Sequence, residues 1–129
     1  MEKIITNPWS WQDARSYVQA VEVKNVDSTL YISGQTAIND QGISSNEDMR
    51  NQLIQTIENL ELVIQRANFE VNNIVRLNIY TTSTSELFEN FDIFQSWVEK
   101  NGIKQTTTLL EVKSLFETLK IELEATLVR

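Results

Sequence analysis

The sequence contains neither cysteine nor histidine among its 129 residues. The absence of cysteine excludes a disulfide framework, a thiolate nucleophile and a sulfur-ligated metal site. Without histidine there is no Ser/His machinery and no ordinary zinc site, so any acid or base must be Asp, Glu, Lys or Tyr. A chain of this length can bury a core that is stable without cross-links. We therefore treat residues 1–129 as a single domain.

Basic residues and long apolar runs are also scarce. The 11 Lys and Arg stand against 18 Asp and Glu, for a formal net charge of -7, and no basic cluster is present to bind a phosphate backbone. No apolar stretch is long enough for a membrane span or, near the N-terminus, for a signal peptide. We predict a soluble cytoplasmic protein that binds neither nucleic acid nor a membrane.

The single proline lies in residues 6–16, a segment that also holds two of the three tryptophans. This segment has no clean period of either helix or strand, so we expect it to be irregular. Trp9 and Trp11 are large apolar side chains, and we expect them to pack against the domain's own core. An interface role for the two rings is the alternative.

The clearest strand pattern covers residues 119–128, where apolar and polar side chains alternate without a break. The pattern predicts that one face of this strand is core and that the other carries Glu122 and Glu124. The predicted core residues are Leu119, Ile121, Leu123, Ala125 and Leu127. A second alternating pattern predicts a strand over residues 74–82, with Val75, Leu77 and Ile79 on one side.

Two further β-rich segments, residues 17–24 and 29–35, are separated by the turn-forming residues 25–28. The spacing predicts that they pair with each other as a hairpin. Residues 106–112 are also β-rich and predict one more short strand.

Apolar residues at spacings of three and four predict two helices. The first covers residues 49–67 and would be capped by Ser45. The second would begin at Ser83, in a capping-box pattern with Glu86, and run unbroken to residue 101. Since each helix has a single apolar stripe, the order of elements predicts an α+β fold in which both helices pack on one face of a mixed β-sheet.

Five short segments resemble the YjgF/RidA family in their order and spacing. They are residues 17–21, residues 30–35 with Ser33-Gly34-Gln35, Gln52 with residues 58–60, residues 75–82 and residues 121–125. The resemblance implies a chorismate-mutase-like subunit that forms a homotrimer with small-molecule clefts between subunits. It also implies the hydrolysis of reactive enamines and imines to a keto acid and ammonia, with no metal and no organic cofactor.

The residues that the family uses for this activity are only partly retained. The resemblance implies substrate-binding roles for Tyr17, Ser33, Gly34 and Gln35 and a catalytic, water-handling role for Glu122. A substrate-clamping arginine of the family aligns with Thr107, where the loss of a charge-assisted contact would cost on the order of 1.5–3 kcal/mol. An asparagine of the family aligns with Phe91. For Asn59 we predict a structural role, as a helix-to-strand hydrogen bond.

Each candidate site residue also has a structural alternative. Glu122 would then be a solvated carboxylate or a contact at a subunit boundary, Tyr17 an intersubunit packing residue, and Ser33 and Gly34 the end of a hairpin arm. Glu124 is expected to be an ordinary residue of the polar face. The cations nearest the missing arginine are Lys104, Arg76, Arg15 and Arg129.

Two hypotheses for function follow from these residues. The first is an enamine or imine deaminase with an altered substrate, since Glu122 is retained while the clamping arginine is replaced by Thr107. The second is a trimeric small-molecule-binding or regulatory module without the chemistry. A ribonuclease, an activity sometimes attached to this family, fits poorly with the net negative charge and the absence of histidine.

Overall fold

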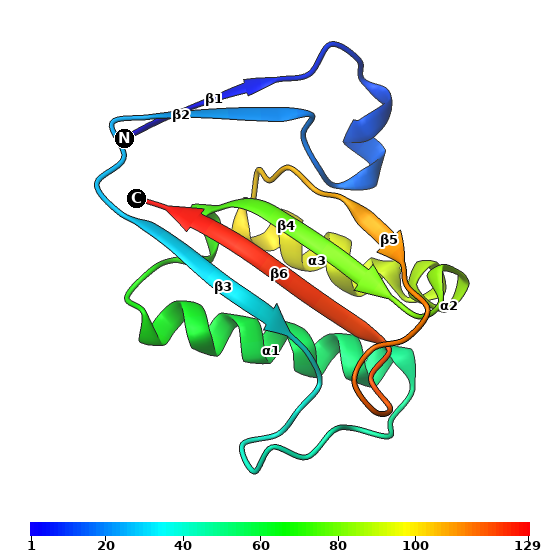
Figure 1. Cartoon of the computed structure of the whole chain (residues 1–129). Coiled ribbons are helices and arrows are strands. Elements are labelled where there is room, and N and C mark those ends of the chain that lie inside the picture. Colours follow the sequence, from blue (N-terminus) through cyan, green and yellow to red (C-terminus); the bar gives the residue numbers. More distant parts are fainter.

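A mixed four-stranded sheet forms the centre of the computed structural model, which describes residues 1–129 (Figure 1). Its strands lie in the order β3 (Thr29–Gln35), β6 (Ile121–Val128), β4 (Ile74–Thr81) and β5 (Leu109–Glu111). Strand β6 is antiparallel to both of its neighbours, whereas β4 and β5 run parallel. The predicted α+β class with a mixed sheet is confirmed.

The predicted hairpin between residues 17–24 and 29–35 is wrong. Strand β2 (Ala20–Lys24) pairs instead with β1 (Glu2–Thr6), a strand that the sequence analysis did not predict, and the two form a separate antiparallel hairpin. The backbone N–H groups of Asp27 and Ser28 donate to the carbonyl of Arg129, at 2.8 and 2.9 Å, and the N–H of Arg129 donates to Ser28 at 3.0 Å. These bonds continue the β3–β6 ladder and hold the connection extended, so the chain does not turn back.

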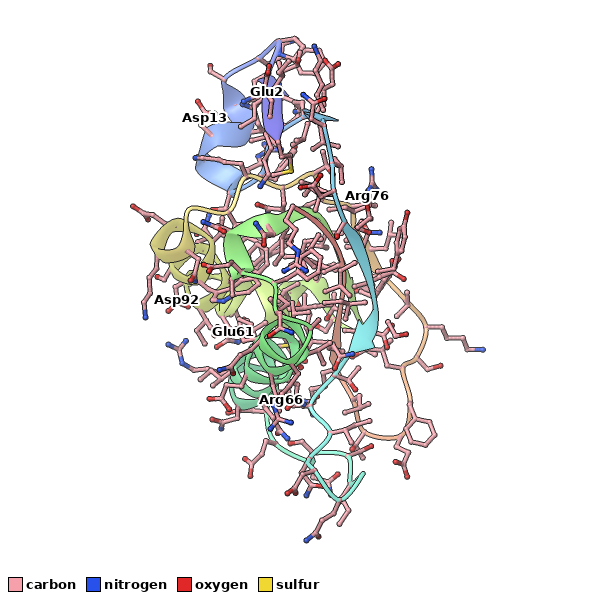
Figure 2. The ribbon with its side chains drawn as sticks, turned by 90° about the vertical axis from the view of Figure 1, so that its left-hand side faces the viewer. Glu2, Asp13, Glu61, Arg66, Arg76 and Asp92 are labelled. Atoms are coloured by element: carbon pink, nitrogen blue, oxygen red, sulfur yellow. The ribbon has the colours of Figure 1, made fainter.

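The β1–β2 hairpin and the short 3-10 helix η1 (Trp11–Arg15) lie at one end of the molecule. Figure 2 shows Glu2 and Asp13 at the opposite end from Arg66 of helix α1 (Met49–Arg66). The segment between η1 and β2 is fastened to the sheet because the N–H of Val18 donates to the carbonyl of Gln105 at 2.9 Å.

The predicted core packing of the two N-terminal tryptophans is also wrong. Trp9 is 56% and Trp11 48% exposed, so neither ring packs into the core. Their rings stack on each other with centroids 5.8 Å apart, and the ring of Trp11 meets that of Tyr17 edge-on at 6.4 Å. The pair is therefore an exposed aromatic surface.

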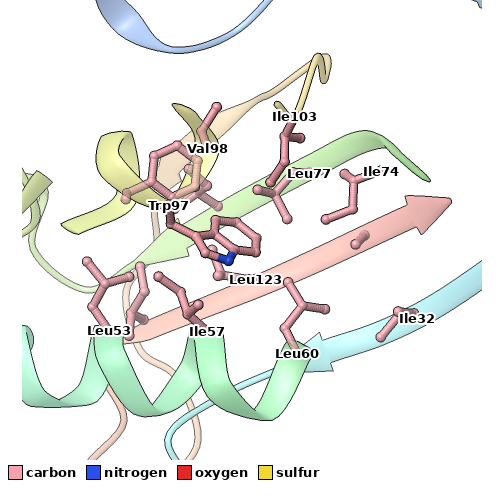
Figure 3. Close-up of a cluster of buried hydrophobic side chains, with 14 of the residues drawn as sticks. Ile32, Leu53, Ile57, Leu60, Ile74, Leu77, Trp97, Val98, Ile103 and Leu123 are labelled. Atoms are coloured by element: carbon pink, nitrogen blue, oxygen red, sulfur yellow. The ribbon is translucent and has the colours of Figure 1, made fainter. Parts of the chain in front are cut away.

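The core lies between the sheet and the helices α1 and α3 (Phe91–Asn101), as Figure 3 shows. All five residues predicted for the core face of the last strand are buried, from Leu119 to Leu127. Strand β4 is shifted in register between Ile74 and Arg76, so Ile74 takes the core position and Val75 is only half-buried. The prediction that Val75 lies on the core side is therefore wrong, because the irregularity puts Ile74 there instead.

Helix α1 has the predicted apolar stripe but a different cap. The carboxylate of Asp48 accepts the N–H of Asn51 at 2.9 Å and caps the helix, whereas the hydroxyl of Ser45 accepts the N–H of Glu47 at 3.0 Å in the preceding turn. The N-cap is therefore Asp48 rather than Ser45.

The predicted second helix is divided into α2 (Thr84–Glu89) and α3. Its start is as predicted, since the hydroxyl of Ser83 accepts the N–H of Glu86 at 3.2 Å. The division falls at Asn90, whose side-chain amide donates to the carbonyl of Glu86 at 2.8 Å. A side chain that bonds the preceding turn competes with the regular backbone ladder.

The sheet face opposite α1 and α3 carries no helix (Figure 1). It presents the polar residues of β4 and β6, including Tyr80, Glu122 and Glu124. None of the helices is long and apolar enough to cross a membrane.

Shortening a buried side chain at the centre of β6 is expected to lower the stability of the fold far more than shortening an exposed side chain. Leu123 is 0% exposed, so Leu123→Ala should lower the free energy of unfolding by about 2–5 kcal/mol through lost burial and a cavity. Leu62 on α1 is 48% exposed, and Leu62→Ala should stay within about 0.5 kcal/mol of the parent protein. Urea unfolding measures both, and equal losses would contradict the assignment of the core.

Candidate functional site

A cavity of about 510 Å³ lies beside the end of η1, between this segment and the helices α2 and α3. Two residues implied in substrate binding, Tyr17 and Thr107, both line it. Arg15, Phe88 and Phe91 line it as well. The structure thus brings the position of the missing arginine and the position of the missing asparagine into one concave space.

Buried amide side chains hold the walls of this cavity in place. The side chain of Gln105 is fully buried and donates to the carbonyl of Ser16 at 2.7 Å and to the hydroxyl of Thr107 at 3.1 Å. The side chain of Gln95 on α3 donates to the carbonyl of Ala14 at 3.0 Å. These bonds fasten η1 and the residues after it to α3 and to the segment before β5, so the cavity is part of the fixed fold.

The replacements at Thr107 and Phe91 make the cavity more apolar than the family pattern implies. Threonine offers a single hydroxyl, and phenylalanine offers no hydrogen bond. Ile79, Phe88 and Phe94 add further apolar lining. A cavity of this kind favours a ligand with an apolar body and few polar groups.

Among the four candidate cations, Arg15 is the one that lines the cavity with Thr107. Its guanidinium lies over the ring of Trp11, 4.9 Å from the centroid, and it takes part in none of the three ion pairs of the chain. Lys104 lines a neighbouring hollow, and Arg129 lies over Phe69 at 4.2 Å. Arg76 lines a third hollow, beneath β2.

Glu122 lies elsewhere, on the helix-free face of the sheet, where it is the register partner of Tyr80. It packs against Gly34: a Cβ atom built on Gly34 would lie 2.5 Å from Cδ of Glu122. Ser33 and Gly34 are exposed, and the side chain of Gln35 folds back to donate to the carbonyl of Ser33 at 3.1 Å. Ser33, Gly34, Gln35 and Glu122 therefore form a second group, which we call the Glu122 group.

Burial raises the pKa of Glu122, and the neighbouring charge of Glu124 raises it further. One carboxylate oxygen of Glu124 accepts both the hydroxyl of Tyr80 and the side-chain amide of Asn78, each at 3.1 Å. Burial, followed by the bond to Glu124, raises the pKa of the Tyr80 hydroxyl. Glu124 thus accepts bonds from two neighbours, whereas Glu122 is the carboxylate of this face whose pKa is raised.

Within one chain the cavity and the Glu122 group are separate. Thr107 shares its cavity with Ile79, which faces the helices, whereas Glu122 is opposite Tyr80 on the other face of the sheet. No group of three or more Asp and Glu side chains is arranged to hold a metal ion.

Three residues of these two sites were not predicted from the sequence. Phe88 lies outside the predicted apolar stripe of its helix, Gln95 is a polar residue of a helix, and Tyr80 lies on the polar side of its strand. Once the β4–β6 pairing is known, the alternation of side chains along the two strands places Tyr80 beside Glu122. Asn59 has its predicted structural role, since it donates to the carbonyls of Thr36 and Ile38, both at 2.8 Å, just beyond the end of β3.

Known proteins match this chain in both sequence and structure. A family model described as Endoribonuclease L-PSP matches residues 10–128. The chain belongs to this family, the YjgF/RidA or Rid family. Its structure is similar to that of a Yersinia pestis protein of unknown function, described as belonging to the conserved Rid protein family YyfB. The TM-score is 0.86 at 27% identity, and the match covers 100% of both chains.

Relatives in sequence place the chain in the same Rid family. A RutC family protein of Aquifex aeolicus is 30% identical over 113 residues, which are 88% of each chain. A 2-iminobutanoate/2-iminopropanoate deaminase of Salmonella typhimurium is 26% identical over 114 residues, 88% of this chain and 87% of that protein. The comparisons therefore show the fold and the family of this chain.

The raised pKa of Glu122 predicts a specific dependence of stability on pH. Because this pKa is above the ordinary 4.5 in the folded state, the folded protein binds the proton more tightly than the unfolded chain does. The contribution of Glu122 to the free energy of unfolding is therefore present below the ordinary pKa and is lost as pH rises through the raised value.

The Glu122→Gln variant should lack this contribution to the pH dependence. Urea unfolding of both proteins between about pH 4 and about pH 7 tests it, since the stability advantage of the parent protein should shrink across that window. Glu124→Gln should lower the pKa of Glu122 without restoring the ordinary value, because burial is the larger cause. An advantage that grew with pH would contradict the assignment.

Proposed function

We propose that this protein binds a small organic acid with an apolar side chain in the cavity lined by Tyr17, Arg15 and Thr107. The observation that carries the proposal is that an arginine without an ion-pair partner, Arg15, lines the same cavity in which Thr107 replaces the clamping arginine. A planar guanidinium is suited to hold a carboxylate with two hydrogen bonds. The apolar lining by Phe88 and Phe91 then selects the side chain of the ligand.

The polar groups around the ligand have distinct roles in this proposal. Arg15 holds the carboxylate, and the hydroxyls of Tyr17 and Thr107 orient the polar end of the molecule. The hydroxyl of Thr107 already accepts a bond from Gln105, which leaves its own hydrogen to donate. Phe91, at the position of the family asparagine, gives the apolar body a ring to pack against.

Phenylpyruvate is a suitable probe because it combines a carboxylate with an aromatic ring. We expect it to bind more tightly than 2-oxobutanoate, and we expect Arg15→Gln to weaken its binding about tenfold, equivalent to about 1.4 kcal/mol. Arg66→Gln is the matched control, since Arg66 is an exposed arginine on α1 far from the cavity. Calorimetric titration measures the affinity of the parent protein for both ligands and the affinity of each variant for phenylpyruvate. An equal loss of affinity in the two variants would refute the role of Arg15.

Imine or enamine hydrolysis is the second candidate, and the raised pKa of Glu122 favours it. A carboxylate whose pKa is raised is a stronger base than an ordinary carboxylate and can return the proton that it accepts, as water activation at an imine carbon requires. Relatives at 26% identity carry the name 2-iminobutanoate/2-iminopropanoate deaminase. The separation of Glu122 from the cavity within one chain argues against it unless a second chain completes the site.

A coupled assay separates the two candidates. A dehydratase generates 2-iminobutanoate, and the release of keto acid is followed with the parent protein, Glu122→Gln and Thr107→Arg. Acceleration by the parent protein that Glu122→Gln abolishes would establish hydrolysis and overturn a purely binding role. Activity confined to Thr107→Arg would show that the natural chain binds without hydrolysing this substrate.

A further inference from the structure

Strands β2 and β3 each have one unpaired edge, as do β1 and β5. Strand β3 is the first strand of the four-stranded sheet and pairs only with β6. Strand β2 pairs only with β1 in the separate hairpin. An open strand edge is a row of free backbone donors and acceptors that pairs readily with another strand.

The β1–β2 hairpin is also too poorly covered to account for its own stability. None of the ten residues of its two strands is buried. An isolated two-stranded hairpin is at best marginally stable in water. Val21 and Val23 of β2 instead line a hollow of about 350 Å³ that separates the hairpin from the main sheet.

The β2 strand of the same chain is kept away from β3. The backbone bonds of Asp27 and Ser28 to Arg129 extend the connection along the main ladder, and Asn25 has a left-handed backbone conformation with φ +57°. Nevertheless the composition of the two strands and the turn residues between them are typical of a hairpin pair. The sequence pattern for β2–β3 pairing is therefore present, and the fold of one chain leaves it unused.

We propose that β2 of a second copy of this chain pairs with the free edge of β3, so that the β1–β2 hairpins are exchanged between copies. An exchanged element makes between chains the contacts that it would make within one. The occupant of the β3 edge is thus a strand of this same sequence, with the length and apolar pattern to fit it. This inference does not depend on the proposed function.

The alternation of side chains sets the register of the exchanged pair. Strand β3 turns Leu30 and Ile32 toward the core, and a slip of one residue would reverse the faces of the incoming strand. An antiparallel pair with Val23 of the partner subunit opposite Leu30 places Val21 of the partner subunit opposite Ile32. Glu22 of the partner subunit then lies opposite Tyr31, which is 79% exposed on this chain.

This register applies to the regular part of β3, from Leu30 to Ile32. Beyond Ile32 the strand is irregular, because its register with β6 shifts before Gln35.

The absence of cysteine makes the exchange directly testable by cross-linking. Glu22→Cys and Tyr31→Cys are made in separate chains, which are unfolded together, refolded and treated with a short bis-maleimide. We expect a covalent dimer that contains one chain of each kind. Glu22→Cys with Leu62→Cys is the matched control, since Leu62 is exposed on α1, and its dimer yield should be at least tenfold lower.

A redesigned connection provides the second arm of the test. Val26→Asn with Asp27→Gly creates a two-residue Asn-Gly turn in the same register, which favours closure of β2 onto β3 of its own chain. In a chain that carries Glu22→Cys and Tyr31→Cys, the cross-link should change from between chains to within one chain.

Sedimentation equilibrium of the unmodified protein completes the experiment, and we expect an assembly of more than one chain. A monomer at micromolar concentration would overturn the exchange. So would cross-links that form only within the chain before the connection is redesigned, or equal dimer yields for Tyr31→Cys and Leu62→Cys.

Discussion

The pairing of β6 on both of its edges is the interaction on which the rest of the structure depends. Strand β6 is the only strand that joins β3 to β4, and without it the main sheet would be a two-stranded β4–β5 pair and a single strand. Its alternation also divides the molecule chemically. Ile121 and Leu123 face the helices and make the core, while Glu122 and Glu124 between them are forced onto the open face.

The chemistry of the candidate site follows from this division. A carboxylate on the open face of β6 cannot reach a cavity that opens on the helix side of β5, however favourable its pKa. The cavity therefore has the character of a binding site, with a guanidinium, two hydroxyls and apolar rings. The Glu122 group holds a carboxyl group with a raised pKa and lies apart from this cavity within one chain.

The sequence was sufficient wherever the controlling interactions are local and periodic. The strand alternation at residues 119–128 and the helical stripe from Met49 to Ile64 identified their core faces correctly, because each depends on spacing alone. The cap of the second helix at Ser83 was also correct, because it depends on residues three apart.

The sequence was insufficient wherever two local patterns compete or distant residues decide. Strand β2 fits β1 and β3 equally well by composition, and contacts of Arg129 about a hundred residues away hold the connection extended. Asp48 and Ser45 are both good caps, and Asn90 breaks a helix whose stripe continues past it. Arg15 could be named as a candidate, but its place beside Thr107 depends on how the N-terminal segment crosses the end of the sheet.

The extended connection from Asn25 to Ser28 has a consequence for the kinetics of this fold. The hairpin and the main sheet are separate hydrogen-bonded units, and only three backbone bonds to Arg129 and Ser28 hold the connection straight. Reversing its direction would break those bonds, the bond from Val18 to Gln105 and the bond from Lys3 to Asn72, and would leave the β3–β6 and β4–β6 ladders intact. The barrier between an extended and a folded-back hairpin is therefore that of a local opening rather than of global unfolding. The β1–β2 hairpin can thus open locally while the core stays folded.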